Sequence, residues 1–344
     1  MSFLGSRRNS RGLTLIELLV AMVVGLVVVL VAVAALTIAR RGFSTVDAAS
    51  QLRDNARFAA DLVQRVGAQA GYRDVFVAAG AVSSDDTREP NVGGFDNALI
   101  DESAPLTTYE ERDAAVPGYG SDVLALRYQA PQLYTGAADP TKAKVSDESM
   151  IDCSGNAIAT VPNPNDTDAG EVTKAFENRI VSIFHVAINQ GEPALMCTYS
   201  ATGAAPWTTV PVIQGVENFQ VLYGVDGVTP NTAPATTEAP DVPDAYLRAD
   251  QMVVAGNAPA TRANWRRVRS IRIGMVVRSA PGATQDSDSQ TYFPFGDAKA
   301  SANGNRGSAF ANSNDPGTTF VPTPDGRLRQ ALSFTIHLRN DQSL

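Results

Sequence analysis

The stretch SRGLTLIELLVAMVVGL, residues 10–26, opens the most apolar part of the chain and decides its fold. Almost every residue from Leu18 to Ile38 is apolar. A helix over that segment would be roughly 31 Å long, which is enough to cross the hydrocarbon core of a bilayer. Glu17 stands at the start of the segment. A carboxylate near the bilayer centre costs roughly 2.5–3.5 kcal/mol on insertion scales, so this glutamate needs an explanation.

Three classes of N-terminal segment fit these residues. A cleaved secretory signal would use the basic leader and an A-x-A site at Ala32 to Ala34, but its apolar core would be unusually long. An uncleaved signal anchor explains the length of the apolar segment but leaves Glu17 without a role. A third class of N-terminal segment assigns a role to Glu17. The leader arginines favour a cytoplasmic N-terminus, although Arg40 and Arg41 on the far side weaken this charge argument.

The third class rests on a resemblance. RGLTLIELLVAMVVGL, residues 11–26, resembles the type III signal at the start of type IV pilins and pseudopilins. The resemblance implies cleavage by a prepilin peptidase after Gly12 and N-methylation of Leu13, where the family more often has Phe. It also implies that Glu17, fifth in the mature chain, pairs with the N-terminal amine of a neighbouring subunit. This neighbour would supply an opposite charge where water is scarce, and we expect Glu17 to be unpaired in a lone subunit.

The helix is expected to continue beyond the apolar segment, from about Thr14 to Ala70, with a stop at Gly71. Its second half is amphipathic, because small and apolar residues recur every three, four or seven positions. That apolar face comprises Val46, Ala49, Ala56, Ala60, Val63, Val66 and Ala70. The polar face comprises Asp47, Gln51, Asp54, Arg57, Asp61 and Arg65.

After Gly71 the pattern changes to the period of two that is typical of antiparallel strands with one buried side. We predict strands at 121–129, 178–188, 194–200, 216–225, 268–277 and 328–338. Long connections rich in Gly, Pro and polar residues are expected at 78–120, 136–172, 226–262 and 279–326. The amphipathic helix would cover the sheet, which predicts an α+β fold.

Several later segments narrow the resemblance to the PilW family of minor pilins. They are NARFAADLVQRVGAQAGYRD, DCSGN, EPALMCTYS, GVENFQVLYGVD, VRSIRIGMVVRS and FTIHLRN, in this order along the chain. The type IV pilin fold that this implies would divide the chain into a leader (1–12), a transmembrane and filament-core helix (13–38), an amphipathic continuation (39–71) and a β-rich head (72–344).

The resemblance also implies a function. A minor pilin of this kind joins other minor pilins and the major pilin, helps to prime pilus assembly and sits near the tip, where a PilY-type adhesin is often presented. Such pili serve twitching motility and adhesion. The chain would lie in the inner membrane as a single-pass protein with a periplasmic head, and in the pilus after assembly. Two alternatives stay open: a J-like pseudopilin of type II secretion, and a membrane-anchored periplasmic binding domain.

Cys153 and Cys197 are enough for one disulfide. A periplasmic head would fold where disulfides form. A bridge would close a loop of about 45 residues and, in the chain-entropy model, stabilise the head by roughly 4 kcal/mol. Two unpaired buried thiols are the alternative.

The sequence does not favour an enzyme. His185 and His337 both lie in predicted strands, the two histidines and two cysteines have no zinc spacing, and no nucleotide or nucleophile motif is present. We expect no cofactor and no metal. The acidic segment 163–171 lacks EF-hand spacing, so a plain turn is favoured over a calcium loop.

A cluster of arginines surrounds Trp265, and the four that we single out as possible docking residues are Arg266, Arg267, Arg269 and Arg272. A solvated sheet face is the simplest explanation, and docking of an acidic partner pilin is the sharper one. DNA binding is the third. The net charge of −8 argues against it, so no nucleic-acid partner is expected.

Overall fold

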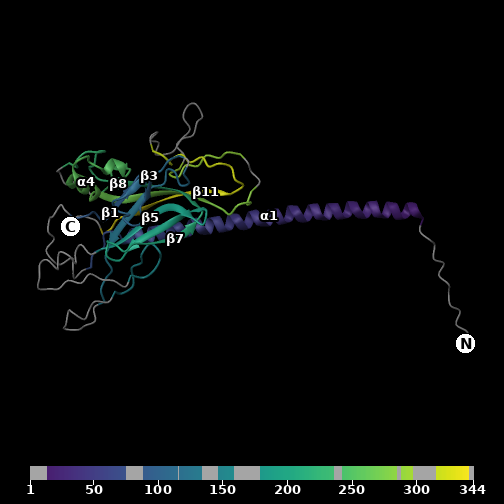
Figure 1. Ribbon diagram of the computed structural model, residues 1–344, viewed down its shortest axis with the longest axis horizontal. Helices are drawn as coiled ribbons and strands as arrows, with labels where there is room; N and C mark the ends of the chain where they lie inside the picture. Colours follow the sequence, from purple (N-terminus) through teal and green to yellow (C-terminus); the bar gives the residue numbers. More distant parts are fainter. Residues whose placement is uncertain are drawn as a thin grey trace, which may run out of the picture.

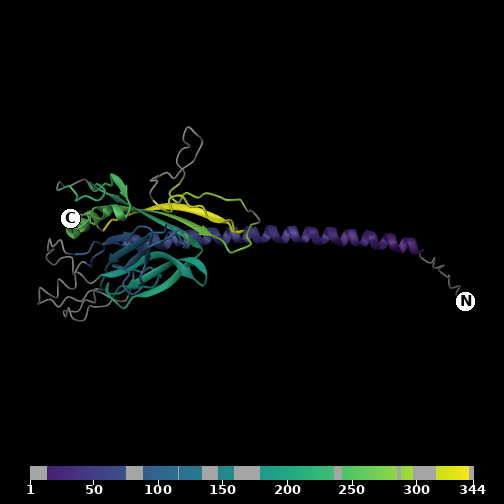
Figure 2. The ribbon, with the colours of Figure 1, turned by 45° about the horizontal axis from the view of Figure 1, so that its top comes forward.

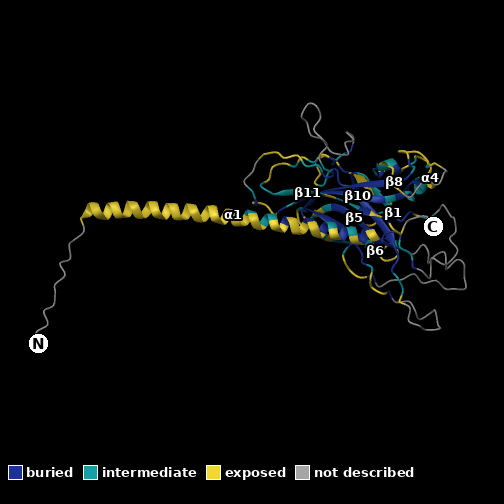
Figure 3. Ribbon diagram, turned by 180° about the vertical axis from the view of Figure 1, so that it is seen from behind, coloured by how far each residue is buried: buried dark blue, intermediate teal, exposed yellow. Residues whose placement is uncertain are grey.

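The computed structural model describes residues 14–74, 88–114, 116–133, 146–158, 179–235, 242–284, 288–296 and 315–340. One long helix, α1 (Leu15–Gln69), carries a β-rich head on its C-terminal half (Figure 1). The N-terminal half of α1 projects away from the head and is exposed along its whole length (Figure 3). Of the described helices, α1 alone is long and apolar enough to cross a membrane.

Both ends of α1 agree with the expected bounds to within one residue. Thr14 is the N-cap, and Ala70 is the C-cap. Gly71 follows with φ of 76°, a left-handed conformation that glycine adopts without steric cost. The helix runs through Gly25 and Gly42 without a break.

The head contains two larger antiparallel sheets and one ribbon. The five-stranded sheet has the order β1 (Val92–Phe95), β4 (Val123–Tyr128), β5 (Ile180–Asn189), β6 (Glu192–Ser200) and β7 (Thr208–Gln214). The four-stranded sheet has the order β11 (Arg329–His337), β10 (Val268–Arg278), β8 (Val216–Val225) and β9 (Ala245–Leu247). The ribbon pairs β2 (Ala98–Ile100) with β3 (Tyr109–Glu111). A 3-10 turn, η2 (Asp250–Met252), and a short helix, α4 (Ala258–Trp265), follow β9.

The buried face of α1 lies between the two larger sheets. Figure 2 shows α1 running alongside β11, with the five-stranded sheet on its other side. Leu52, Val63 and Val66 join both sheets in one apolar core. The approach to β11 is close, because a Cβ at Gly67 would lie 2.6 Å from the Ile336 side chain. The head therefore folds around the helix and depends on it for its core.

The expectation of one buried side per strand is wrong for β4 and β5. The first seven residues of β5 and all six of β4 are buried. The second face of these strands packs under the β2–β3 ribbon in a smaller apolar cluster that includes Ala98, Ile100 and Ile183. The ribbon was not predicted, so the burial on this face could not be expected either.

The six predicted strands are all present, but the expected connections contain further elements. Strands β1, β2 and β3 lie within 78–120, and β9, η2 and the first residues of α4 lie within 226–262. These elements are short, and β1 reads VGGF, whose two glycines hide the alternation of a strand. The other two connections, 136–172 and 279–326, contain isolated bridges, between Ile151 and Ala157 and between Tyr292 and Phe320. Strand β7 was also missed, because TTVPVIQ contains a proline that is tolerated at this edge of the sheet.

The ends of the two sheets are joined by a network of ion pairs. Glu217 on β8 binds Arg278 on β10 at 2.7 Å and Arg329 on β11 at 2.6 Å. Glu192 on β6 binds Arg278 at 2.6 Å and Arg327 at 2.7 Å, which links the five-stranded sheet to the four-stranded one. The Glu217 side chain is only 8% exposed, so these charges are largely shielded from solvent screening.

We expect Glu217→Gln to lower the free energy of unfolding by about 1.5–3 kcal/mol, because the charged bonds to Glu217 are weakened while Arg278 keeps Glu192 and Arg329 keeps Asp325. Chemical denaturation of the full chain in detergent would measure this. Glu102→Gln, at an exposed loop position, is the matched control and should change stability by less than about 0.5 kcal/mol. Equal stability of the two variants would show that the network contributes nothing.

Candidate functional site

The carboxylate of Glu17 caps the start of α1. Glu17 Oε2 accepts hydrogen bonds from the Thr14 backbone N–H at 2.9 Å and from the Thr14 hydroxyl at 3.0 Å. In return, the Glu17 N–H donates to Thr14 Oγ1 at 3.4 Å. This is a capping box, which satisfies backbone donors that an N-terminus otherwise leaves free. Glu17 is therefore hydrogen-bonded within its own chain, and its pairing with the opposite charge of a neighbouring subunit stays a prediction.

The second carboxylate oxygen of Glu17 has a different environment. Both bonds from Thr14 end on Oε2, and the side chain is fully exposed at the end of the helix. The other oxygen, Oε1, is thus accessible to a further donor. Capping within the chain and pairing with another chain are geometrically compatible.

Charged residues flank the apolar segment of α1 at both ends. Glu17 precedes it, Arg40 and Arg41 follow it, and Leu18 to Ile38 contains no charged residue. On an unbroken helix, Glu17 and Arg40 lie about 35 Å apart along the axis. A hydrocarbon core of about 30 Å fits between them, so a spanning helix places the carboxylate near one headgroup layer rather than at the bilayer centre.

The second half of α1 presents a mixed face away from the head. Phe43, Val46 and Phe58 are all more than half exposed. Charged residues lie among them, at Arg53, Asp54, Arg57, Asp61 and Arg65, and all are exposed. This outward face therefore mixes apolar and charged side chains, and it continues from the exposed N-terminal half of α1.

The end of α1 is fixed to the head beside a disulfide. A bridge joins Cys153 and Cys197, which are both fully buried. Gln69 forms two hydrogen bonds with the backbone of Ile151, at 2.7 and 2.9 Å. The Tyr128 hydroxyl donates to the Ile151 carbonyl at 2.8 Å. The loop that leads into the bridge is thereby bonded to the last turn of the helix, and the bridge bonds it to β6.

The four arginines singled out from the sequence do not converge on one patch. Arg266 donates to the carbonyl of Arg88 at 2.7 Å, and Arg269 donates to the carbonyl of Arg266 at 2.9 Å. Arg267 donates to backbone carbonyls of Asp226, Gly227 and Ala235. These bonds organise the turn between α4 and β10, and docking to a partner remains an untested prediction.

The fourth residue, Arg272, lies on the outer face of β10 and is half-buried. That face is not the solvated surface that the pattern suggested. Val276 on the same face is buried, and a Cβ at Gly274 would lie 2.7 Å from the backbone of Pro294. The segment around Pro294 covers this part of the sheet, so Val276 is buried and Arg272 is half-buried.

Neither histidine has the environment of a metal ligand or an acid–base group. His185 is buried and hydrogen-bonded to Thr198 at 2.9 Å. Burial, and next the nearby Arg112 charge, lower the pKa of His185 to about 3, so it is neutral near pH 7. His337 is exposed at the end of β11. Across the described residues, no group of three or more His, Cys, Asp or Glu side chains could hold a metal ion.

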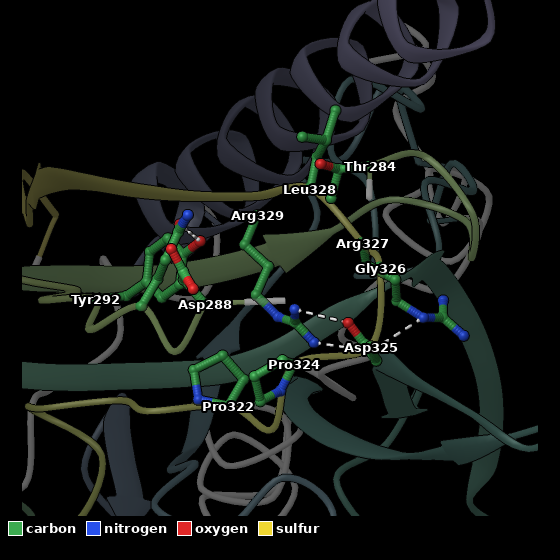
Figure 4. A pocket seen from close by; sticks show the side chains of 11 residues that line it. Thr284, Asp288, Tyr292, Pro322, Pro324, Asp325, Gly326, Arg327, Leu328 and Arg329 are labelled. Atoms are coloured by element: carbon green, nitrogen blue, oxygen red, sulfur yellow. Dashed lines mark hydrogen bonds and ion pairs between the residues drawn. The ribbon is translucent and has the colours of Figure 1, made fainter. Parts of the chain in front are cut away.

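Three sequence predictions lie outside the described residues: the cleavage position Gly12, the methylation position Leu13, and the acidic segment 163–171. Two of the hollows in the described part of the head are lined by charged side chains. One, of about 370 Å³, lies where Leu52 and Asn55 of α1 face Gln214 and the Arg278–Glu192 pair. The other, of about 100 Å³, contains Tyr292 and the ion pair between Arg329 and Asp325 (Figure 4). Their charged side chains are paired with one another, which suits a structural role.

One polar cluster was missed by sequence reasoning. The carboxyl groups of Asp96, Asp122 and Asp315 lie close enough to influence one another, with Arg248 and Asp250 beside them. No spacing signal could have found the cluster, because its members come from separate segments that only the fold brings together.

Comparisons with known proteins give two family matches and a similar solved structure. Residues 7–33 match the prokaryotic N-terminal methylation motif, and residues 183–340, just under half of the chain, match the family described as type IV pilus-assembly protein W. Among solved structures, a type IV-like pilin from Thermus thermophilus is similar at 12% identity and a TM-score of 0.35, covering 85% of this chain and 98% of that one. No curated protein matches significantly.

We expect reduction of the Cys153–Cys197 bridge to destabilise the head by roughly 4 kcal/mol, since it frees a loop of 44 residues in the unfolded chain. Denaturation of the full chain with and without reductant would measure the change. The double variant Cys153→Ser with Cys197→Ser should be equally destabilised and insensitive to reductant. An unchanged midpoint on reduction would contradict the prediction.

Proposed function

We propose that the chain is a type IV pilin-like minor pilin of the PilW family and that it primes pilus assembly within a complex near the tip. The N-terminal methylation motif and the PilW match support the proposal. In this proposal it is a structural subunit and not a catalyst. Its partners are other minor pilins, the major pilin and, at the tip, a PilY-type adhesin. Twitching motility and adhesion are the activities that it would serve.

One observation carries the proposal: the apolar half of α1 is fully exposed, yet it continues without a break into the core of the head. An exposed apolar segment of this length needs a bilayer or a bundle of similar helices around it. A subunit that moves from membrane to filament meets both conditions. Before assembly the chain would span the inner membrane once with its head in the periplasm, and afterwards its helix would lie in the filament core.

The N-terminus would be processed before assembly. In the proposal, a prepilin peptidase removes residues 1–12 after Gly12 and methylates Leu13. Segment 13–38 then forms the membrane and filament-core part, 39–71 the part that packs on the head, and 72–344 the head. Cleavage would place the new terminal amine on Leu13, one residue before Thr14, which caps the helix.

Glu17 would link neighbouring subunits at this end. Its Oε2 atom is used by Thr14, and Oε1 is left for the methylated amine of a neighbour. An ammonium group that meets a carboxylate in a water-poor environment gains much more than a pair in water does. The capping box holds the carboxylate in one orientation, so the pairing needs little further ordering.

We expect Glu17→Ala to give a chain that is inserted and cleaved normally but is depleted at least about tenfold from sheared pili, since one lost charged hydrogen bond is worth ~1.5–3 kcal/mol. Immunoblots of membranes and sheared pili would measure the ratio, with mass spectrometry of the mature N-terminus. Thr37→Val is the control, because it removes a polar group from the same segment without removing a charge. Normal incorporation of Glu17→Ala would refute the pairing.

We expect deletion of the gene to remove surface pili while protein secretion continues, because a priming subunit is needed before the filament can grow. Sheared pili and the secretome of the deletion and complemented strains would be compared. Intact pili with failed export would instead assign the chain to a type II secretion pseudopilus. Intact pili with normal export would contradict an assembly role.

A further inference from the structure

Three carboxyl groups, of which two are buried and one is half-buried, meet where the two larger sheets contact each other. Asp96 follows β1, Asp122 precedes β4, and Asp315 belongs to the segment 315–320, which we call the strap. Asp122 is 4% exposed and Asp315 is 9% exposed. Buried carboxyls that influence one another are costly to ionise together.

Asp122 is the fixed point of this cluster. Its Oδ1 accepts the Asn97 N–H at 3.0 Å, and its Oδ2 accepts the Val221 N–H of β8 at 2.7 Å. Asp96 lies close enough to Asp122 for its charge to raise the pKa of the Asp122 carboxyl. Neighbouring carboxylates repel each other, so the pair favours a state in which one of them carries a proton.

The nearby cations do not balance the charge. Arg248 approaches Asp96 at 3.6 Å, but its two shorter bonds, of 2.9 and 2.7 Å, go to Asp250. Arg112 lies near Asp122 but donates to the backbone carbonyls of Ala98, Pro117 and Val186. The other titratable groups that face the cluster are Glu111 and Tyr223. The cluster is therefore negative unless it holds protons.

The strap is packed tightly against this cluster. A Cβ at Gly317 would lie 2.5 Å from the Gly120 carbonyl oxygen and 2.6 Å from the Gln220 amide nitrogen. The Thr318 hydroxyl donates to the Asp315 carbonyl at 2.9 Å. Oδ1 of Asp315 is buried and has no hydrogen-bond partner. A neutral carboxyl tolerates this position far better than an ionised one.

Burial is the main cause of the altered acidity. Burial and then neighbouring carboxylates together raise the pKa of Asp96 to about 6 and that of Asp315 to about 7, against the opposing charge of Arg248. A carboxyl whose pKa is higher in the folded state stabilises the fold in acid. That stabilisation is complete below the ordinary pKa of about 3.8 and is lost as pH rises through about 6 to 7.

We propose that Asp96, Asp122 and Asp315 form a pH-operated latch, in which the protonated cluster holds the strap against β8 and Gly120, and ionisation of Asp315 releases it. The released strap would uncover buried polar side chains of β8, including Asn218 and Gln220. The head would then present a different surface beside the junction of its two sheets in acidic and in neutral surroundings.

Hydrogen exchange of the full-length protein in detergent, at about pH 5 and about pH 8 and corrected for intrinsic rates, tests the latch. In the native chain, protection of residues 315–320 should fall at least about tenfold at the higher pH, as one pKa unit corresponds to a tenfold change. Asp315→Asn should remain protected at both values. Asp325→Asn is the control: Asp325 lies in the same connection but is paired with Arg329 at 2.8 Å, and this variant should keep the native pH dependence at the strap.

Native-chain measurements make the proposal falsifiable even if Asp315→Asn folds poorly. With 13C-labelled aspartate carboxyls, at least two groups should titrate above about pH 5.5, and a chain whose aspartates all titrate below this value overturns the latch. Equal strap protection at both pH values also overturns it. The latch is also overturned if calcium chloride restores the protection of the strap in neutral solution. A bound cation would then have the role that we assign to the proton.

Discussion

The packing of α1 between β11 and the five-stranded sheet is the contact on which the rest of the structure depends. Leu52, Val63 and Val66 supply the side of the core that neither sheet could provide alone. The close approach at Gly67 brings β11 onto the helix, and β11 in turn pairs along its whole length with β10. Since the same helix continues into an exposed apolar half, the head cannot fold without also presenting that half to its surroundings.

The long helix and the longer strands could be predicted because each has a clear period and a clear end. Thr14 and Gly71 mark the helix by capping chemistry, and alternation marks β10 and β11. The ribbon β2–β3 could not be predicted, because its strands have three residues each and no usable period. The same omission hid the second buried face of β4 and β5.

The candidate site was predictable to different extents for similar reasons. Glu17 was identified because a carboxylate beside an apolar segment is conspicuous, but its bond with Thr14 needed the geometry of the helix end. The arginines near Trp265 were conspicuous in the sequence as well, yet their bonds run to nearby backbone carbonyls. The aspartate cluster was invisible, because tertiary contacts alone bring Asp96 and Asp315 together.

The head thus treats its buried charges in two opposite ways. Around Glu217 and Glu192, arginines on neighbouring strands match the carboxylates, and the ends of the sheets are fixed together. Around Asp122, backbone N–H groups take the place of a cation. In the proposed latch, this difference separates a rigid part of the head from an adjustable one.

The attachment of the helix end has a mechanical consequence. Beyond the core contacts that begin at Leu52, tension along the axis of α1 would also pass from Gln69 through its paired bonds to Ile151, two residues before Cys153. From there a covalent bond transmits the force to Cys197 in β6, a strand with hydrogen-bonded neighbours on both sides. A pulling force is therefore spread across a sheet in shear instead of peeling one strand at a time.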